Sequence, residues 1–238
     1  MKNQSDISPE SYKYFVQNAA ITIPKNKALF WSRTKEDAFQ FANVAGYVTL
    51  EKTLIGLLGD GLVWCGENDN SELAEECLDP FTNGTATGSF WNKMSETFAR
   101  TASGEVQVLL NGSTGLAFNS SSTFGSVEVY SLDPNKVSTM NIWILYYFNG
   151  SDWVIKESCK GHSIEKLKDI LTAKNITSSC TENNRKLIHI QCARFSNESI
   201  YELCLSGVSN IDMTFSTTTL LAIIIAIHKW FEELVLHS

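Results

Sequence analysis

Residues 141–148 have the sequence NIWILYYF, a nearly continuous apolar run. Such a run is typical of a strand that is buried on both faces of a parallel sheet. Two more strands are predicted upstream: Val106–Leu110, which ends at the turn Asn111-Gly112, and Ser126–Tyr130, where apolar and polar residues alternate. The middle of the chain is therefore expected to supply the centre of a sheet.

Helical patterns flank these strands. Ser32 or Thr34 can cap a short helix that reaches about Phe41, and Thr49 opens a stretch with leucines at helical spacing. Further helices are predicted over Trp91–Ala102 and Ile164–Ala173, and short strands over Ile176–Ser179 and Ile188–Gln191.

The order of these elements predicts the fold class. The first half of the chain is mostly helical, and the second half alternates strand and helix. We expect an α/β (α+β) fold with two lobes and a tail. The mainly helical lobe takes residues 1–24 and 49–102, the small parallel-sheet α/β lobe takes residues 25–48 and 103–205, and the C-terminal tail takes residues 206–238.

Charge and motifs exclude several function classes. The net charge is −7 and the pI is about 5.1, with no run of Lys and Arg longer than two residues, so nucleic acid is not an expected partner. The chain has no GxSxG, HExxH or Walker A motif. Its four histidines show no metal-ligand spacing, and no metal is predicted.

The six cysteines favour disulfides. None belongs to a CxxC pair, which disfavours zinc and redox sites. Neighbouring cysteines are 12, 21 and 12 residues apart, which suits the pairs Cys65–Cys77, Cys159–Cys180 and Cys192–Cys204. Six cysteines allow 15 connectivities, so this pairing rests on spacing alone.

Glycosylation sequons favour the same oxidising compartment. Seven Asn-x-Ser/Thr sequons begin at Asn3, Asn83, Asn111, Asn119, Asn149, Asn175 and Asn197. Together with an even number of cysteines they predict an extracellular or cell-surface protein. The N-terminal residues MKNQSDISPESYKYF contain no signal-peptide core, so this location requires a leader outside the chain.

The C-terminal tail has two interpretations of equal weight. Residues 220–227 are apolar, but eight residues are too few to span a bilayer. With Ser206, Gly207 and Ser209 upstream, the tail can be a removable GPI signal that leads to membrane anchoring. It can equally be a terminal amphipathic or buried helix.

Two tryptophans and one glutamate are candidate site residues. Trp31 lies in LFWSRTK, Trp91 in SFWNKMS and Glu128 in STFGSVEVY. Pattern alone favours a structural role for each: the tryptophans as core anchors, and Glu128 on the solvent face of a half-buried strand.

The segments around them resemble a known family. LFWSRTKE, TLEKTLIGLLGDGLVWCGE, FWNKMSETFA, VLLNGS and STFGSVEVY, in this order, resemble the ADP-ribosyl cyclase/NAD glycohydrolase family from about residue 28 to 205. The resemblance implies the family's two-lobed fold, and its disulfides map onto the three short-range pairs. One departure is Lys52, where the family usually has an acidic residue.

The resemblance also implies roles for individual residues. Glu128 matches the catalytic glutamate, and Glu51 matches an acidic pocket residue that influences cyclisation against hydrolysis. The remaining matches are Trp31 and Trp91 around the nicotinamide and ribose, Asp60 as a second pocket carboxylate, Ser95 near the ribose, and Ser32, Arg33, Thr123, Phe124 and Ser126 around the diphosphate.

The expected activity is cleavage of the nicotinamide–ribose bond of NAD(P)+ to nicotinamide and ADP-ribose, with a lesser cyclic ADP-ribose-forming activity. Cyclase-dominant relatives place an aromatic residue where Thr123 stands, so we expect mainly hydrolysis. NAD(P)+ is then the substrate, and no cofactor is expected. A homodimer is compatible with this reading.

The alternative is a catalytically weak glycoprotein of the same fold that acts as a receptor or binding module. The retention of Glu128, Trp31 and Trp91 argues against it.

Overall fold

A parallel sheet forms the centre of the molecule. The computed structural model describes residues 8–19, 21–62 and 85–209. Four strands, β1 (Leu29–Ser32), β2 (Gly104–Asn111), β3 (Val137–Leu145) and β6 (Thr177–Glu182), lie in the order β1-β2-β3-β6, and every pair is parallel. The predicted parallel sheet is confirmed. The run NIWILYYF supplies the end of β3 and the short β4 (Tyr147–Phe148), which pairs antiparallel with β5 (Trp153–Val154).

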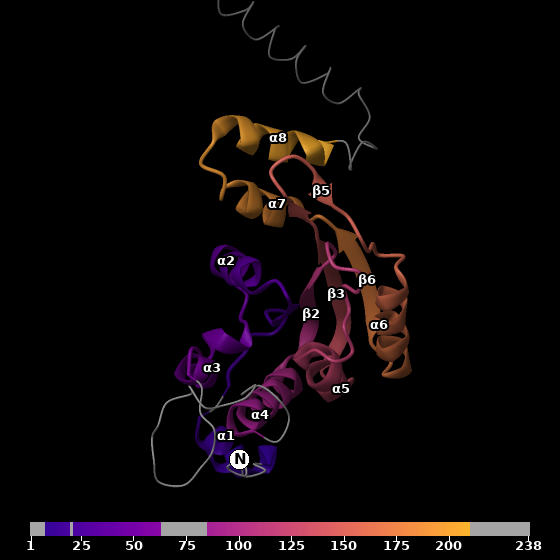
Figure 1. Cartoon of the computed structure of the whole chain (residues 1–238). Coiled ribbons are helices and arrows are strands. Elements are labelled where there is room, and N and C mark those ends of the chain that lie inside the picture. Colours follow the sequence, from indigo (N-terminus) through magenta and orange to yellow (C-terminus); the bar gives the residue numbers. More distant parts are fainter. Residues whose placement is uncertain (1–7, 20, 63–84, 210–238) are drawn as a thin grey trace, which may run out of the picture.

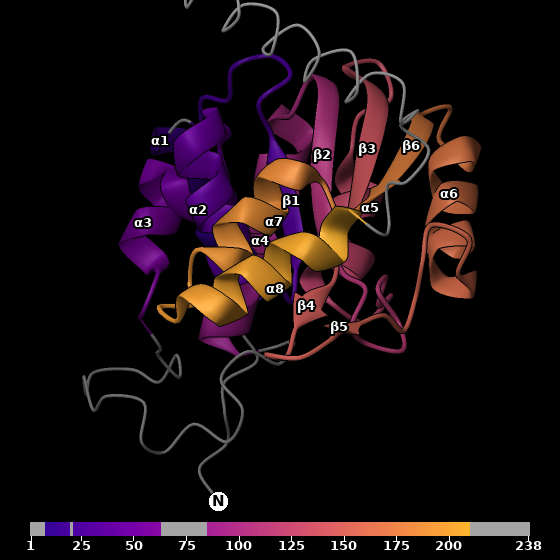
Figure 2. The same cartoon turned by 90° about the horizontal axis from the view of Figure 1, so that it is seen from above.

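Helices pack on both faces of this sheet, as Figures 1 and 2 show for α2 and α6 on opposite sides of β2 and β3. The helical elements are η1 (Pro9–Tyr12), α1 (Lys13–Asn18), α2 (Lys35–Ala45), η2 (Leu50–Lys52), α3 (Leu54–Gly59), α4 (Ala86–Thr101), η3 (Phe124–Glu128), α5 (Val129–Ser131), α6 (His162–Ala173), α7 (Arg185–Cys192) and α8 (Glu198–Ser209). One core cluster joins α4 and α6 to one sheet face, and a second joins α2 and α7 to the other. This is the predicted α/β fold. The division into two lobes stays a prediction.

The helices predicted from Ser32 and from Thr49 differ in the structure. The chain from Ser32 is not yet helical: β1 ends at Ser32, and α2 begins at Lys35 after the N-cap Thr34. The predicted helix from Thr49 is divided into η2 and α3, because Thr53 adopts an extended conformation and its hydroxyl accepts the Gly56 N–H at 3.2 Å. Leu54, Leu57 and Leu58 of that stretch are exposed.

Two predicted strands are wrong. Ser126–Tyr130 is not a strand but the end of η3, a π-helical turn, and the start of α5. The Ser122 hydroxyl accepts the Gly125 N–H at 3.1 Å, and the Ser122 carbonyl accepts the Ser126 N–H at 2.8 Å, so these bonds start a helix. Ile188–Gln191 lies inside α7, which Asn184 caps by accepting the Lys186 N–H at 3.1 Å.

The other predicted elements are confirmed with small shifts of their ends: β2, β3 and β6 among the strands, and α4 and α6 among the helices. Cys159–Cys180 and Cys192–Cys204 form disulfides, as their spacing predicted. Cys65 and Cys77 lie outside the described residues. No helix among the described residues is long and apolar enough to cross a membrane.

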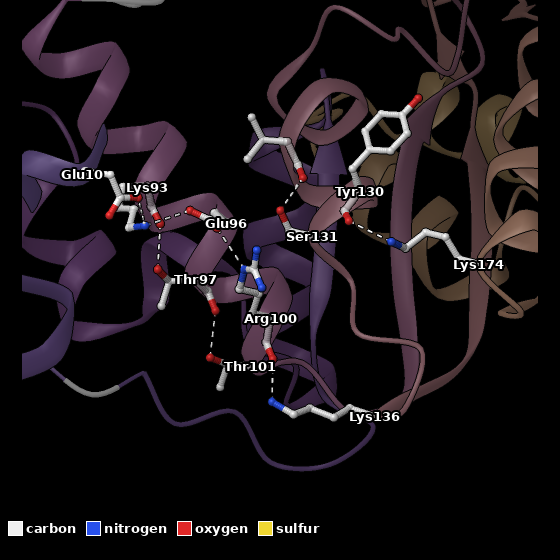
Figure 3. Close-up of polar contacts among 11 residues, drawn as sticks. Glu10, Lys93, Glu96, Thr97, Arg100, Thr101, Tyr130, Ser131, Lys136 and Lys174 are labelled. Carbon is white, nitrogen blue, oxygen red and sulfur yellow. Dashed lines mark hydrogen bonds and ion pairs between the residues drawn. The ribbon is translucent and has the colours of Figure 1, made fainter. Parts of the chain in front are cut away.

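Polar contacts fix the outer side of α4, which Figure 3 shows. Lys93 pairs with Glu10 at 2.6 Å and with Glu96 at 3.1 Å. At the C-terminal end of α4 the Lys136 ammonium donates to the Arg100 carbonyl at 3.0 Å, which satisfies an end carbonyl and complements the helix dipole. These contacts leave the opposite side of α4 free to line a cavity.

Gly125 in η3 allows a test of this local fold. A Cβ atom at Gly125 would lie 2.1 Å from the Asn119 carbonyl oxygen and 2.8 Å from the Ser120 Cα, both main-chain atoms. We expect Gly125→Ala to lower the free energy of unfolding by about 1–3 kcal/mol, as other overpacked sites do. Thermal melting measures the effect. Gly115→Ala is the matched control, because a Cβ there meets nothing within 4 Å; equal melting temperatures of the two variants would contradict this account.

Candidate active site

One cavity of about 610 Å³ lies beside β1. Its walls come from β1 and the turn after it, η2, the end of α3, α4 and the segment 121–128. The lining residues are Leu29, Phe30, Trp31, Ser32, Arg33, Lys35, Leu50, Glu51, Asp60, Gly61, Leu62, Gly88, Trp91, Asn92, Ser95, Phe98, Ser121, Ser122, Thr123, Phe124 and Glu128. Ten of the eleven residues predicted for the substrate site are among them.

The end of β1 and the turn after it present three of these residues, Trp31, Ser32 and Arg33. Arg33 has a left-handed backbone with φ of 58°, an uncommon conformation for a residue with a side chain. The Asn111 side chain holds this turn by donating to the Arg33 carbonyl at 3.3 Å, and the Arg33 guanidinium donates to the Leu116 carbonyl at 3.2 Å. The turn therefore reverses the chain directly after Trp31 and Ser32, which leaves both at the cavity.

One stripe of α4 forms the facing wall. Gly88, Trp91, Asn92, Ser95 and Phe98 follow one another at helical spacing, and all five line the cavity. Trp91 is held by Phe90, whose ring centre lies 5.3 Å from the Trp91 ring centre in an edge-to-face contact.

The Glu128 carboxyl group is buried at the end of η3, with 8% of the residue exposed. Burial and, after it, the nearby Glu51 charge raise the pKa of Glu128 to about 8, although the Ser95 hydroxyl acts to lower it. The predicted place of Glu128 on the solvent face of a strand is therefore wrong, and the carboxyl faces the cavity.

Glu51 is the second carboxyl of the cavity. Burial raises its pKa, and hydrogen bonds oppose this, including one from the Trp31 indole N–H to Oε2 at 3.2 Å. The same indole ring lies edge-to-face on Phe39, with ring centres 6.3 Å apart. Trp31 is thus a cavity wall whose polar edge fixes the orientation of Glu51.

The mouth of the cavity carries cationic side chains, in contrast to the carboxyl groups deeper inside. Arg33 and Lys35 are exposed there, and the Lys35 ammonium pairs with the Asp60 carboxylate at 2.9 Å. Ser121 and Thr123 also line the cavity and supply hydroxyl groups, whereas the Ser122 hydroxyl is engaged by the Asn119 carbonyl and the Gly125 N–H. The cavity can therefore bind a molecule with a cationic ring at its carboxyl-lined end and phosphates at its mouth.

Two residues that the sequence singled out lie outside the cavity lining. Ser126 does not line the cavity: it is exposed, and its hydroxyl donates to the Ser122 carbonyl at 2.8 Å, which supports η3. Lys52 does not line it either, because its ammonium donates to the Asn43 side chain on α2. The lining residues that the sequence argument missed include Lys35, Asn92, Ser121 and Ser122. The helical spacing from Trp91 and Ser95 could have identified Asn92.

A buried carboxylate outside the cavity anchors the segment that leads to η3. Glu157 accepts the Ser163 N–H at 2.7 Å, the Ser163 hydroxyl at 2.6 Å and the Ala117 N–H. The Ser163 hydroxyl in turn accepts the Phe118 N–H at 2.9 Å. The loop between β2 and η3 is therefore tied to the start of α6.

In the described ranges, no three His, Cys, Asp or Glu side chains are grouped so that they could hold a metal ion.

The Glu128 pKa predicts how stability depends on pH. Between about pH 4.5 and 8 folded Glu128 keeps a proton that the unfolded residue loses, so the free energy of unfolding falls as pH rises through this window. Glu128→Gln removes this penalty. We expect its melting temperature to exceed that of the wild type increasingly from pH 5 to pH 8.5, by an amount worth on the order of 3 kcal/mol.

Thermal melting at these pH values checks this expectation. Glu202→Gln on α8 is the control, because its side chain is exposed. A Glu128→Gln variant whose advantage over the wild type does not grow with pH would contradict the buried, protonated carboxyl.

Comparison with known proteins gives a consistent set of relatives. A family model described as ADP-ribosyl cyclase matches residues 1–200. ADP-ribosyl cyclase/cyclic ADP-ribose hydrolase 1 of Oryctolagus cuniculus is 42% identical over 198 residues, which cover 81% of this chain and 65% of that protein. ADP-ribosyl cyclase/cyclic ADP-ribose hydrolase of Aplysia californica is 34% identical over 197 residues, 81% of this chain and 68% of that protein.

Solved structures agree in fold. Porcine CD38 complexed with a covalent intermediate, ribo-F-ribose-5'-phosphate, superposes with a TM-score of 0.68 at 41% identity over 76% of this chain and 79% of that chain. Aplysia cyclase complexed with the substrate NGD and the product cGDPR has a TM-score of 0.73 at 35% identity over 82% of this chain and 78% of that chain. The chain spans slightly less than two thirds of the length of its mammalian relatives numbered 1.

Proposed function

This chain belongs to the ADP-ribosyl cyclase family, and from this premise we propose that it is an NAD(P)+ glycohydrolase. It cleaves the nicotinamide–ribose bond to give nicotinamide and ADP-ribose, and has a lesser ADP-ribosyl cyclase activity. The observation that supports this most is one cavity in which the nearby Glu51 charge, after burial, raises the pKa of Glu128, with Trp31 and Trp91 in its walls.

The bond that breaks sets what the residues must do. Nicotinamide is cationic while bound to ribose and leaves as a neutral molecule, so no general acid is needed for its departure. The electrons of the C1′–N bond leave with nicotinamide, and positive charge develops on the ribose as in glycoside hydrolysis. An ionised carboxylate beside C1′ stabilises that charge, and we assign this role to Glu128.

Because the pKa of Glu128 is raised, binding of the substrate itself ionises this carboxyl group. In the empty cavity the carboxyl is largely protonated near pH 7, because its pKa is about 8. A cationic nicotinamide ring next to the carboxyl favours its charged form and lowers the pKa. Substrate binding therefore releases the Glu128 proton and produces the carboxylate that the reaction uses.

The other residues bind and orient the substrate. Trp31 and Trp91 attract the flat cationic ring, each worth about 0.5–2 kcal/mol. Arg33, Lys35 and the hydroxyls of Ser121 and Thr123 bind the phosphates at the mouth. Water then attacks the ribose C1′ to give ADP-ribose, or the substrate's own adenine attacks it to give the cyclic product.

The same proposal includes an extracellular or cell-surface location. The disulfides Cys159–Cys180 and Cys192–Cys204 support an oxidising compartment. GPI anchoring through the tail and a homodimer belong to the proposal as well, and residues 210–238 of that tail lie outside the described ranges.

The activity is tested by chromatography of the products after purified protein is incubated with NAD+. We expect the wild type to release nicotinamide, with ADP-ribose as the main second product. Glu128→Gln keeps the size but not the charge of the side chain, and should lower kcat by at least about 100-fold. Glu202→Gln on the exposed side of α8 is the control and should keep full activity. Equal nicotinamide release by Glu128→Gln and wild type would overturn the assignment.

Thr123 allows a test of the product ratio. It is exposed at the cavity mouth, and a small side chain there offers no flat surface on which adenine can fold back. We expect Thr123→Phe to raise the fraction of cyclic product several-fold, because an aromatic ring stacks on adenine. Thr123→Ser is the matched control and should leave the ratio unchanged. A wild-type mixture dominated by cyclic ADP-ribose would contradict this reading.

A further inference from the structure

The β6 side of the sheet has an open face and an open edge. In the part of the chain that the structure describes, β6 pairs only with β3 and forms the sheet edge opposite β1. Thr177, Ser179 and Thr181 of β6 are exposed on one face, beside Thr139 and Asn141 of β3. Parallel sheets are normally covered on both faces, and an open edge strand can pair with another chain.

This open face is polar and internally bonded. The hydroxyls of Thr139 and Thr177 lie 2.8 Å apart, and the Ser179 hydroxyl donates to Asn141 Oδ1 at 2.7 Å. Such a surface suits a hydrophilic cover rather than an apolar helix. The covering helix α6 packs on the other face, where Ile164, Leu167 and Leu171 join the core.

A glycosylation sequon lies at the start of this strand. Asn175-Ile176-Thr177 joins α6 to β6, and Thr177 is the first residue of β6. Asn175 is exposed and has a left-handed backbone with φ of 58°, and its backbone N–H donates to the Thr172 carbonyl at 2.9 Å. Within the described ranges its carboxamide makes no hydrogen bond.

The other described sequons differ in this respect, because each of their asparagine side chains is engaged. Asn111 donates to Arg33 and Asn119 accepts the Ser121 N–H. Asn149 accepts the Ser151 and Asp152 N–H groups, and Asn197 accepts the Ile200 N–H. Only Asn111 uses its Nδ2 in these contacts, and the other three accept through Oδ1; Asn175 is the described sequon whose carboxamide makes no hydrogen bond at either atom.

We propose that Asn175 carries an N-linked oligosaccharide that covers the open edge and polar face of β6. This inference rests on the extracellular location proposed above. In the transfer step Asn175 Nδ2 forms a bond to the sugar C1 of a lipid-diphosphate-linked oligosaccharide. The C1–O bond to the diphosphate breaks, the lipid diphosphate leaves with the electron pair, and Nδ2 loses one proton.

The position is compatible with the proposed activity. The cavity lies beside β1, and β6 is at the other edge of the sheet, with β2 and β3 between them. A sugar chain at Asn175 therefore leaves the substrate path open. Its expected effect is to prevent β6 from pairing with a second copy of the chain.

The test is mass spectrometry of the chain secreted from glycosylating cells behind a cleavable leader. Glycans are removed by peptide N-glycosidase in 18O water, which marks each formerly modified asparagine. We expect the Asn175 peptide to carry the mark. Asn175→Asp should lose one glycan, keep kcat/KM, and form several-fold more dimer or aggregate in size-exclusion chromatography at high concentration.

The substitution at residue 175 and its control are chosen to preserve the fold. Aspartate tolerates the left-handed backbone of residue 175, so the variant is expected to fold. Thr177→Ser is the matched control, because it retains both the sequon and a hydroxyl at the Thr139 contact. An unmarked Asn175 beside other marked sequons would overturn this inference alone, and no marked asparagine at all would overturn the location as well. A monomeric, glycan-free Asn175→Asp would overturn the covering role.

Discussion

The carboxyl group of Glu128 is buried beside a second carboxyl group, and the rest of the site is arranged around this electrostatic cost. Burial and the Glu51 charge together raise the Glu128 pKa to about 8. A protein with no use for this carboxyl would gain stability by replacing it, since stability and activity often oppose each other at functional sites. A cationic substrate offsets the cost of ionising the buried carboxyl group. It favours the charged carboxylate at the place where positive charge develops on the ribose.

Several local structures hold Glu128 in this position. The π-helical turn η3 can form because residue 125 has no Cβ to meet the Asn119 carbonyl, and because Ser122 bonds its first N–H groups. The loop before η3 is fixed by the buried Glu157 carboxylate. On the other wall, Trp31 near the end of β1 donates to Glu51, and the left-handed Arg33 lies in the turn that follows. These turns lie near β1, at one edge of the sheet, and β6 forms the other edge.

The sequence predicted the sheet better than the site's local backbone. NIWILYYF predicted a strand because a nearly continuous apolar run is typical of the strands of parallel sheets, and it supplies the end of β3 and β4. The segment around Glu128 was predicted wrongly because two valines around one glutamate alternate as in a strand. The contacts that make it helical lie upstream: Ser122 accepts the Gly125 and Ser126 N–H groups, and Gly125 lies against the Asn119 carbonyl. The left-handed Arg33 had no sequence signal. The cavity residues came from resemblance, which named ten lining residues and also Ser126, whose hydroxyl bonds the main chain instead.

Proton release on ligand binding tests whether Glu128 is protonated before the substrate arrives. Titration calorimetry of a non-hydrolysable NAD+ analogue at pH 7, in buffers with different ionisation enthalpies, counts the protons that leave the protein. With a Glu128 pKa of about 8 in the empty cavity, the wild type should release nearly one proton per ligand. Glu128→Gln should bind the analogue and release almost none. Equal proton release by the two proteins would show that Glu128 does not change its protonation when the ligand binds, and would contradict the account.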